Sequence, residues 1–332
     1  MKRWQIPFLL FLIVGTAFIL SKSTPYQRNE GKIFGTSYRI VYKSADDLSH
    51  KIKEKLQEVN NSLSPFEKGS IISKINNNVE VEPDSMFIYV FNMAQDVSKD
   101  TEGAFDITVA PLVNAWGFGF KKGIDPDSAT IDSLKQFVGY NKIAIEAGKI
   151  KKKHPETTLN CSAIAKGYGC DAVAQMLQSH GINDYMIEIG GEVSLKGKND
   201  KGTAWSIGVS KPSENGNLTN ELQTVLKLTD CSMATSGNYR NYRYKDGKRY
   251  SHTIDPHTGY PVEHTLLSAT VVARECAYAD ALATAFMVMG LEKSIAYCEE
   301  HPEIDGYFIY TDESGKLRTQ ETSNFNRYKR KR

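Results

Sequence analysis

Segments with the residue pattern of β-strands cluster between about residues 185 and 272, and this clustering constrains the fold more than any other feature. Helical patterns lie on both sides of the cluster and do not alternate regularly with the strands. A doubly wound parallel sheet needs a helix between successive strands, so the pattern favours an α+β fold. The expected strands are 33–41, 187–195, 205–209, 225–228, 249–254, 266–272 and 306–310.

Helices are expected where apolar residues recur at helical spacing. In residues 47–63 they recur every three or four positions, and Asp47 stands where a helix cap is expected. The other expected helices are 84–97, 163–177, 276–289 and 291–299, and residues 213–220 are expected to form a loop. We find no internal repeat in the 332 residues, so one large domain or two modest ones would fit the length.

The first 23 residues are expected to direct export. Lys2 and Arg3 precede an apolar run at 6–20, which matches the charged and apolar regions of a signal peptide. The run is shorter than the roughly 20 residues of a membrane span. It would still serve as an uncleaved anchor with Trp4 at the membrane interface, and a buried core helix is a third alternative.

The charge distribution excludes a dedicated nucleic-acid binder. The chain has 41 basic and 39 acidic residues, but five basic residues lie in the last six positions and two at the start. Subtracting these seven leaves 34 basic against 39 acidic residues, a body at about −5 without a basic stripe. We expect residues 24–31 to be a polar linker and residues 326–332 a solvated basic tail.

The cysteines indicate neither a zinc site nor a disulfide framework. There are five of them, an odd number, and no two have the C-x-x-C spacing. Despite the expected export, we interpret them as small buried apolar residues.

Two segments combine small or apolar residues with one charged side chain. Asp106 lies within the apolar stretch 103–113, where it is either a cap or turn residue or part of a ligand pocket. Residues 160–171 lead small side chains into a helix that carries Lys166. A helix N-terminus beside an ammonium suits an anion, although Lys166 alone would be an ordinary surface lysine, and the Walker pattern is absent.

Two further segments have polar side chains at positions that suit a site. His252 follows an expected strand and precedes the turn 255–259, in which Asp255 is either functional or only turn-forming. Gly190 and Gly191 form either a close-approach point or a plain bend. Asp280 and Thr284 lie one turn apart on an expected helix, which suits Mg²⁺, unless Asp280 caps the helix and Thr284 bonds to a carbonyl.

Taken together, these segments resemble the ApbE-type FAD:protein FMN transferases, a flavin transferase family. The matching stretches occur in the family's order at 34–36, 103–119, 162–171, 190–192, 235–237, 252–259 and 279–284. The resemblance implies an ApbE-like, T-fold-related α+β domain over residues 32–325, with mixed, largely antiparallel sheets packed against helices. A single such motif would be weak, whereas seven in order are specific.

The resemblance also implies a reaction and its residues. FMN would pass from FAD to a Thr or Ser hydroxyl of a target protein through a phosphoester bond, with release of AMP and a requirement for Mg²⁺. Asp280, Thr284 and the carbonyl of Ala163 would hold the metal. Lys166 would supply positive charge, and His252 is our candidate base. The residues expected to line the FAD site are Phe34, Phe66, Ala104, Phe105, Asp106, Asn160, Lys166 and Ile254.

The sequence departs from the family pattern at two points, one in the expected FAD site and one at the expected membrane anchor. Most relatives carry Asp where this chain has Asn160, and the chain lacks the cysteine that would carry an N-terminal lipid. The apolar segment would replace that anchor at the periplasmic face of the bacterial inner membrane, or be cleaved to give a soluble periplasmic protein.

The resemblance also suggests target proteins and leaves other activities open. Expected acceptors are subunits of Na⁺-translocating NADH:quinone oxidoreductase or of Rnf-type complexes, or other exported flavoproteins. Two alternatives remain: hydrolysis of FAD to FMN and AMP in the same site, and non-catalytic flavin binding.

Overall fold

The structure is a computed structural model, which describes residues 24–121, 123–124, 126–212, 221–238, 242–245 and 248–329. The expectations for residues 1–23 and for the loop 213–220 lie outside the described residues. Within the described ranges, no helix is both long and apolar enough to cross a membrane.

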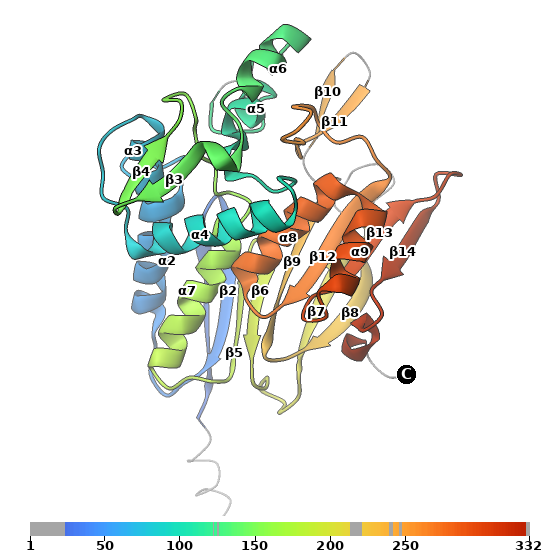
Figure 1. Cartoon of the computed structure of the whole chain (residues 1–332). Coiled ribbons are helices and arrows are strands. Elements are labelled where there is room, and N and C mark those ends of the chain that lie inside the picture. The colour runs from blue at the N-terminus through green and yellow to red at the C-terminus, as the bar shows by residue number, and fades with distance from the viewer. Residues whose placement is uncertain are drawn as a thin grey trace, which may run out of the picture.

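An antiparallel sheet of eight strands forms the centre of the molecule (Figure 1). Every pair of neighbouring strands in it runs antiparallel, which confirms the predicted α+β class. In spatial order the strands are β1 (Tyr26–Ile33), β2 (Thr36–Lys43), β5 (Tyr185–Ile189), β6 (Glu192–Lys196), β9 (Cys231–Gly237), β12 (Leu266–Ala273), β13 (Asp305–Thr311) and β14 (Leu317–Glu321).

Two hairpins correct the strands expected from the sequence. Residues 26–31, predicted as linker, belong to β1, which turns through Phe34 and Gly35 into β2. The single strand expected at 187–195 is the pair β5 and β6, because Gly190 and Gly191 both adopt positive φ angles, 67° and 109°. Such angles suit glycine and reverse the chain.

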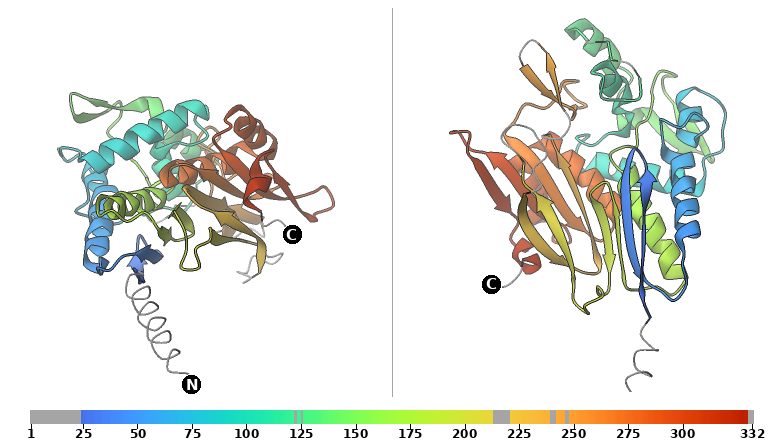
Figure 2. Two further views of the ribbon diagram at one scale, coloured as in Figure 1. Left: turned by 90° about the horizontal axis from the view of Figure 1, so that it is seen from below. Right: turned by 180° about the vertical axis from the view of Figure 1, so that it is seen from behind.

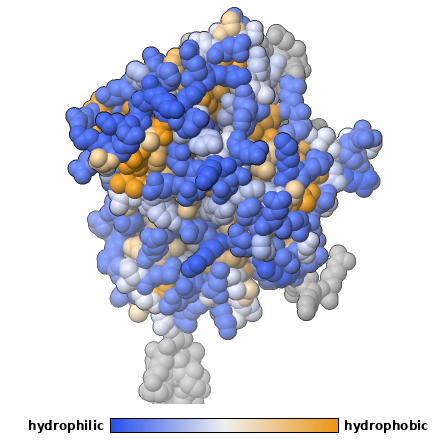
Figure 3. Space-filling model, viewed as in Figure 1, coloured by the Kyte–Doolittle hydropathy of each residue, from blue (hydrophilic) through white to orange (hydrophobic). Residues whose placement is uncertain are grey.

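Helices cover one face of the sheet in two layers (Figure 1). The inner layer is α7 (Ala165–Ser179), α8 (Cys276–Met289) and α9 (Leu291–Glu300), which contact strands directly. The outer layer is α2 (Ser49–Leu63) against α7 and α4 (Ser85–Asp100) against α8. All five were predicted, and in α2 and α4 the apolar residues have clear helical spacing. The face they form is mostly hydrophilic, with an apolar patch over α3 (Ile71–Asn76) and β4 (Lys149–Lys152) (Figure 3).

The opposite face of the sheet is covered by a hairpin of β7 (Trp205–Ser210) and β8 (Leu222–Leu228) (Figure 2). Trp205, Ile207 and Val209 of β7 pack with sheet residues such as Val193 and Tyr307 in one buried cluster. Alternate residues of β7 are therefore buried, as expected for a strand with one covered face.

The described part of the basic tail is solvated but held against the body, since the Arg327 side chain is 52% exposed and ion-paired. The turn η3 (Phe325–Tyr328) buries Phe325, and the Arg327 guanidinium forms an ion pair with the buried Asp305. The Tyr328 hydroxyl donates to the same Asp305 carboxylate at 2.8 Å. A buried carboxylate needs such partners, which explains why Arg327 and Tyr328 are held in place. Residues 330–332 lie outside the described ranges.

Smaller elements gather beyond one end of the sheet (Figure 1). They are η1 (Ile107–Val109), α5 (Ala110–Ala115), α6 (Ser128–Lys135), β3 (Ile143–Glu146), β10 (Tyr242–Lys245) and β11 (Lys248–Ser251). Tyr26, which begins β1 and pairs with Lys43 at the end of β2, lies at the opposite end of the sheet. We call these smaller elements together the cap, because they lie over one end of the sheet.

The packing of α7 on α8 depends on Gly167. A Cβ atom at this position would lie 2.3 Å from the carbonyl oxygen of Cys276 and 2.8 Å from the Cα of Ala277. Both atoms belong to the backbone of α8, so they cannot move aside without moving the helix.

We expect Gly167→Ala to lower the free energy of unfolding by about 1–3 kcal/mol, the usual cost of overpacking a core. Urea unfolding followed by circular dichroism measures this change. The matched control is Gly69→Ala, because Gly69 is exposed and no atom lies within 4 Å of a Cβ built there. Equal unfolding midpoints for the two variants would contradict the close approach of the helices.

Candidate functional site

A pocket of about 320 Å³ lies under the cap, between α7, α8 and the ends of the central strands. Eleven of the residues predicted for the site line this pocket, although they are far apart in the sequence. Those on its wall are Phe66, Ala104, Phe105, Asp106, Asn160, Ala163, Lys166, His252, Ile254, Asp280 and Thr284. The fold thus brings together in one cavity what the sequence predicted as separate patches.

Phe34 is the one predicted site residue that does not line this pocket. It lies at the β1–β2 turn, and a Cβ built on Gly169 of α7 would come within 2.7 Å of its ring. Its side chain therefore supports α7 from behind the pocket, and its predicted contact with FAD stays a prediction.

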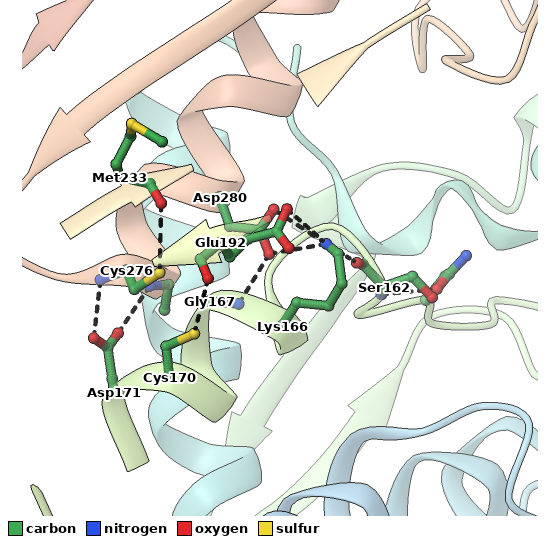
Figure 4. A network of polar contacts seen from close by, with 11 residues as sticks. Ser162, Lys166, Gly167, Cys170, Asp171, Glu192, Met233, Cys276 and Asp280 are labelled. Carbon is green, nitrogen blue, oxygen red and sulfur yellow. Dashed lines mark hydrogen bonds and ion pairs between the residues drawn. The ribbon is translucent and has the colours of Figure 1, made fainter. Parts of the chain in front are cut away.

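Lys166, in the first turn of α7, lies between two buried carboxylates (Figure 4). Its Nζ is 3.3 Å from Oδ2 of Asp280 and 3.4 Å from Oε1 of Glu192. It also donates to the carbonyl oxygen of Ser162 at 3.4 Å. One ammonium thus faces two acids, so this end of the pocket has an excess of negative charge.

A carboxylate of each helix caps the first turn of the other. The Gly167 amide of α7 donates to Oδ2 of Asp280 at 3.1 Å. In return, the Asp171 carboxylate of α7 accepts from the amides of Cys276 and Ala277, at 2.9 and 2.8 Å (Figure 4). Neither helix has a side-chain cap of its own at its N-cap residue. Free amides at a helix start attract carboxylates, so the two acids lock the helices together.

The charges in this cluster shift each other's titration. Burial alone would lower the pKa of Lys166, but the charges of Asp280 and Glu192 outweigh it and raise this pKa well above its usual value. Lys166 therefore stays a cation. Burial raises the pKa of Glu192 to about 7, the charge of Lys166 opposes the shift, and Asp280 adds to it.

Oxygen atoms suited to a hard cation meet at the same end of the pocket. Asp280 and Thr284 are one turn apart on α8, and both line the cavity with Ala163. Oε2 of Glu192 is buried and has no hydrogen-bond partner among the described residues. The described ranges contain no cluster of three or more His, Cys, Asp and Glu side chains suited to a metal. A cation here would therefore depend on hydroxyl and carbonyl oxygens as well as on Asp280.

Asp106 combines the two roles that the sequence left open. Its Oδ1 accepts from the amide and the hydroxyl of Thr108, at 2.7 and 2.6 Å, so it caps the turn η1. The same residue is buried on the pocket wall, and burial raises the pKa of its carboxyl group. Asn160 lies near it, because the backbone amide of Asn160 donates to the backbone carbonyl of Ile107 at 2.7 Å.

His252 follows β11, and its ring lines the pocket edge-on to Phe118, with 6.5 Å between ring centroids. The turn after it is held by Asp255, whose backbone carbonyl and Oδ1 accept from Gly259 and His257, at 2.8 and 2.9 Å. Asp255 does not line the pocket, so its role in the structure is that of a turn residue.

Glu192 is the site residue that the sequence analysis missed. It was part of a matching stretch, but a buried carboxylate at the start of a strand cannot be distinguished by sequence from an exposed one. The signal available was its position directly after Gly190 and Gly191, where the chain reverses. The five cysteines are all free, and all but Cys231 are buried, as the sequence predicted.

The pocket joins a partly apolar wall to a buried cluster of one ammonium and two carboxylates, and comparisons with known proteins identify the family of the chain. The ApbE family model matches residues 34–308. The FAD:protein FMN transferase of Vibrio cholerae serotype O1 is 36% identical over 327 residues, which covers 95% of this chain and 96% of that protein. The FAD:protein FMN transferase of Escherichia coli K12 is 34% identical, with 80% and 79% covered.

Solved structures agree with this match. The flavin transferase ApbE from Vibrio cholerae has a TM-score of 0.83 at 37% identity, covering 92% of this chain and 99% of that one. The ApbE protein of Thermotoga maritima has a TM-score of 0.81 at 28% identity, covering 92% and 100%. The chain therefore belongs to the ApbE family.

Because burial raises the pKa of Glu192 to about 7, we expect stability to depend on pH. The unfolded side chain titrates near 4.3, so between about pH 4.3 and 7 the folded protein holds a proton that the unfolded chain has lost. The free energy of unfolding should therefore fall as pH rises through this window.

The measurement is urea unfolding of wild type and Glu192→Gln in buffer with EDTA, from pH 4 to 8. Wild type should lose roughly 2–3 kcal/mol relative to the variant over the window. Near pH 4 both side chains are neutral, so the two proteins should have similar stabilities there. Parallel curves across the whole range would contradict the raised pKa.

Proposed function

We propose that this protein transfers FMN from FAD to a Thr or Ser hydroxyl of a target protein, forming a phosphoester bond and releasing AMP. The observation that carries the proposal is that one pocket joins an aromatic and apolar wall to the Lys166–Asp280–Glu192 cluster. The names of relatives that match nearly the whole chain support it.

The apolar part of the pocket would hold the flavin ring of FAD, and the charged part would hold its pyrophosphate. The rings of Phe66, Phe105 and Phe118 line one part, and planar ring systems suit the flavin. Phe66 is 67% exposed and edge-on to Phe120, so it is open to a stacking partner. At the other part, Lys166 would face the pyrophosphate, with a bound cation offsetting the excess charge of Asp280 and Glu192. Ala104, Asp106, Asn160 and Ile254 complete the proposed FAD contacts.

We propose that Mg²⁺ is held by Asp280, Thr284 and the carbonyl of Ala163. These residues fit the ion because they offer hard oxygen donors, and because one ammonium leaves the two buried carboxylates incompletely neutralised. When bound, Mg²⁺ would neutralise phosphate oxygens and favour departure of AMP.

The chain's own residues account for the remaining steps. The acceptor hydroxyl oxygen forms a bond to the FMN-side phosphorus, and the bond from that phosphorus to the bridging oxygen breaks. AMP leaves with the electron pair, and the hydroxyl proton passes to His252. Lys166 remains protonated throughout, because the carboxylates hold its pKa high, and it stabilises the charge on the phosphates.

Acceptors and location complete the proposal. Residues 1–23 would export the protein, as a cleaved signal or as an anchor in the bacterial inner membrane, with the pocket on the periplasmic side. The proposed acceptors are the exported domains of Na⁺-translocating NADH:quinone oxidoreductase or Rnf-type subunits, or of other exported flavoproteins.

Purified full-length protein should convert FAD, Mg²⁺ and such an acceptor domain into AMP and a covalently flavinylated domain. Mass spectrometry of the domain and chromatography of the nucleotides measure both products. AMP with free FMN would instead show FAD hydrolysis, and unchanged FAD would leave only flavin binding.

The metal assignment predicts that Asp280→Ala lowers the transfer rate by at least about a hundredfold. Thr284 offers a matched pair, because Thr284→Ser keeps the hydroxyl oxygen and Thr284→Val removes it at nearly constant volume. Calorimetric titration with Mg²⁺ should show weakened binding for Thr284→Val and near-normal binding for Thr284→Ser. Equal binding by the two variants would exclude Thr284 as a ligand.

His252→Ala should lower the transfer rate by about 10²–10⁴-fold, the usual contribution of a general base, while FAD still binds. The control is His257→Ala, since His257 is exposed and outside the pocket wall, with its Nε2 on the Glu102 carbonyl at 2.8 Å. Stopped-flow rates and fluorescence titration with FAD separate chemistry from binding. Near-normal transfer by His252→Ala would assign the base to another group.

A further inference from the structure

A second cleft, of about 440 Å³, opens next to the flavin pocket on the opposite face of the sheet. Its floor is the outer face of β5, β6 and β9, with Met186, Glu188 and Val193, and one wall is β7. Gly190 and Thr235 line both this cleft and the flavin pocket. The two cavities therefore meet at the β5–β6 turn and the adjoining part of β9.

The cleft follows the edge of β7. All five consecutive residues from 206 to 210 line it, although alternate side chains of a strand point to opposite faces. Consecutive residues share a cavity only when it runs along the backbone edge. In the described ranges β7 pairs with β8 alone, and β8 has a bridge to Lys329 through Leu226. Along residues 206–209, the edge of β7 that faces away from β8 therefore has no strand partner among the described residues.

The partition between the two cavities at this point is bare backbone. Gly190 and Gly191 have no side chains, and the Gly190 amide is fixed by donation to the Ser37 carbonyl at 3.0 Å. A Cβ added to Gly190 would lie 2.9 Å from Cγ2 of Thr36 and 3.3 Å from Oε2 of Glu192. A side chain at Gly190 would therefore crowd the turn between the cleft and the Lys166 cluster.

An unused hydrogen-bond acceptor lies directly behind this turn. Oε2 of Glu192 is buried, with the residue only 3% exposed, and it has no partner in the described part of the chain. A buried oxygen of this kind is costly unless a donor reaches it. A hydroxyl group that enters past Gly190 would supply that donor beside Lys166.

We propose that the cleft along β7 binds an extended, hydroxyl-bearing segment of the acceptor protein as an added strand. Its backbone would pair with the open edge of β7, and its Thr or Ser would reach the flavin pocket across Gly190 and Gly191. An open strand edge offers a row of main-chain donors and acceptors, which suits a polypeptide better than a small molecule. This inference rests on the proposed function, since it assigns the acceptor its place in that reaction.

The test places a bulky side chain on each wall of the cleft. Ser37 of β2 and Ser206 of β7 are both exposed and line it, so Ser37→Trp and Ser206→Trp should block it independently. The matched control is Thr319→Trp, an exposed strand position on β14 outside the cleft. Binding of the acceptor domain is measured by calorimetry, KM for the domain by the transfer assay, and Kd for FAD by fluorescence.

We expect each cleft variant to weaken acceptor binding and to raise KM for the acceptor at least tenfold, with Kd for FAD changed less than twofold. Unchanged FAD binding also shows that the variants are folded. Wild-type acceptor binding in both cleft variants, or an equal loss in Thr319→Trp, would overturn the proposal.

The two proposals fail in different ways. If wild type transfers no FMN, the proposed function fails, while the binding measurement still decides whether this cleft holds the acceptor.

Discussion

The reciprocal capping of α7 and α8 is the interaction on which the rest of the site depends. Asp280 of α8 accepts from the first turn of α7, and Asp171 of α7 accepts from the first turn of α8. Gly167 permits this because a side chain there would collide with the α8 backbone. The same contact places Lys166 against Asp280, so helix packing and site electrostatics are one arrangement and not two separate features.

The electrostatics of this cluster show why the net charge of the body says little about the site. Positive charge is concentrated at one point, Lys166, and its two carboxylate partners are buried where solvent screens them little. The carboxylates keep the ammonium charged, and their own excess charge makes the same place attractive to a metal cation. Composition alone reports the sum of these charges and hides their placement.

Most helices and the class of the fold followed from the sequence, because burial on one face leaves a repeating pattern, as in α2 and α4. The sequence predicted one strand over 187–195, with Gly190 and Gly191 as a close-approach point or a bend, whereas their positive φ angles divide it into β5 and β6. β9 was missed because Cys231–Gly237 is rich in small polar residues, although it occupies the centre of the sheet. Glu192 and the held part of the tail depend on long-range contacts, with Lys166 and with Asp305, that no local pattern contains.

The direction of β1 has a consequence for the reach of the protein. Its first residue, Tyr26, lies shortly after residues 1–23, which we propose direct export. Its last residue, Ile33, lies at the end of the sheet where the Ser37 carbonyl accepts from the Gly190 amide beside the pocket. Eight extended residues span about 25 Å. A molecule tethered through residues 1–23 would therefore carry its pocket roughly the thickness of the domain away from the bilayer surface. Its partners would have to present their hydroxyl on a domain or flexible arm that stands equally far from the lipid.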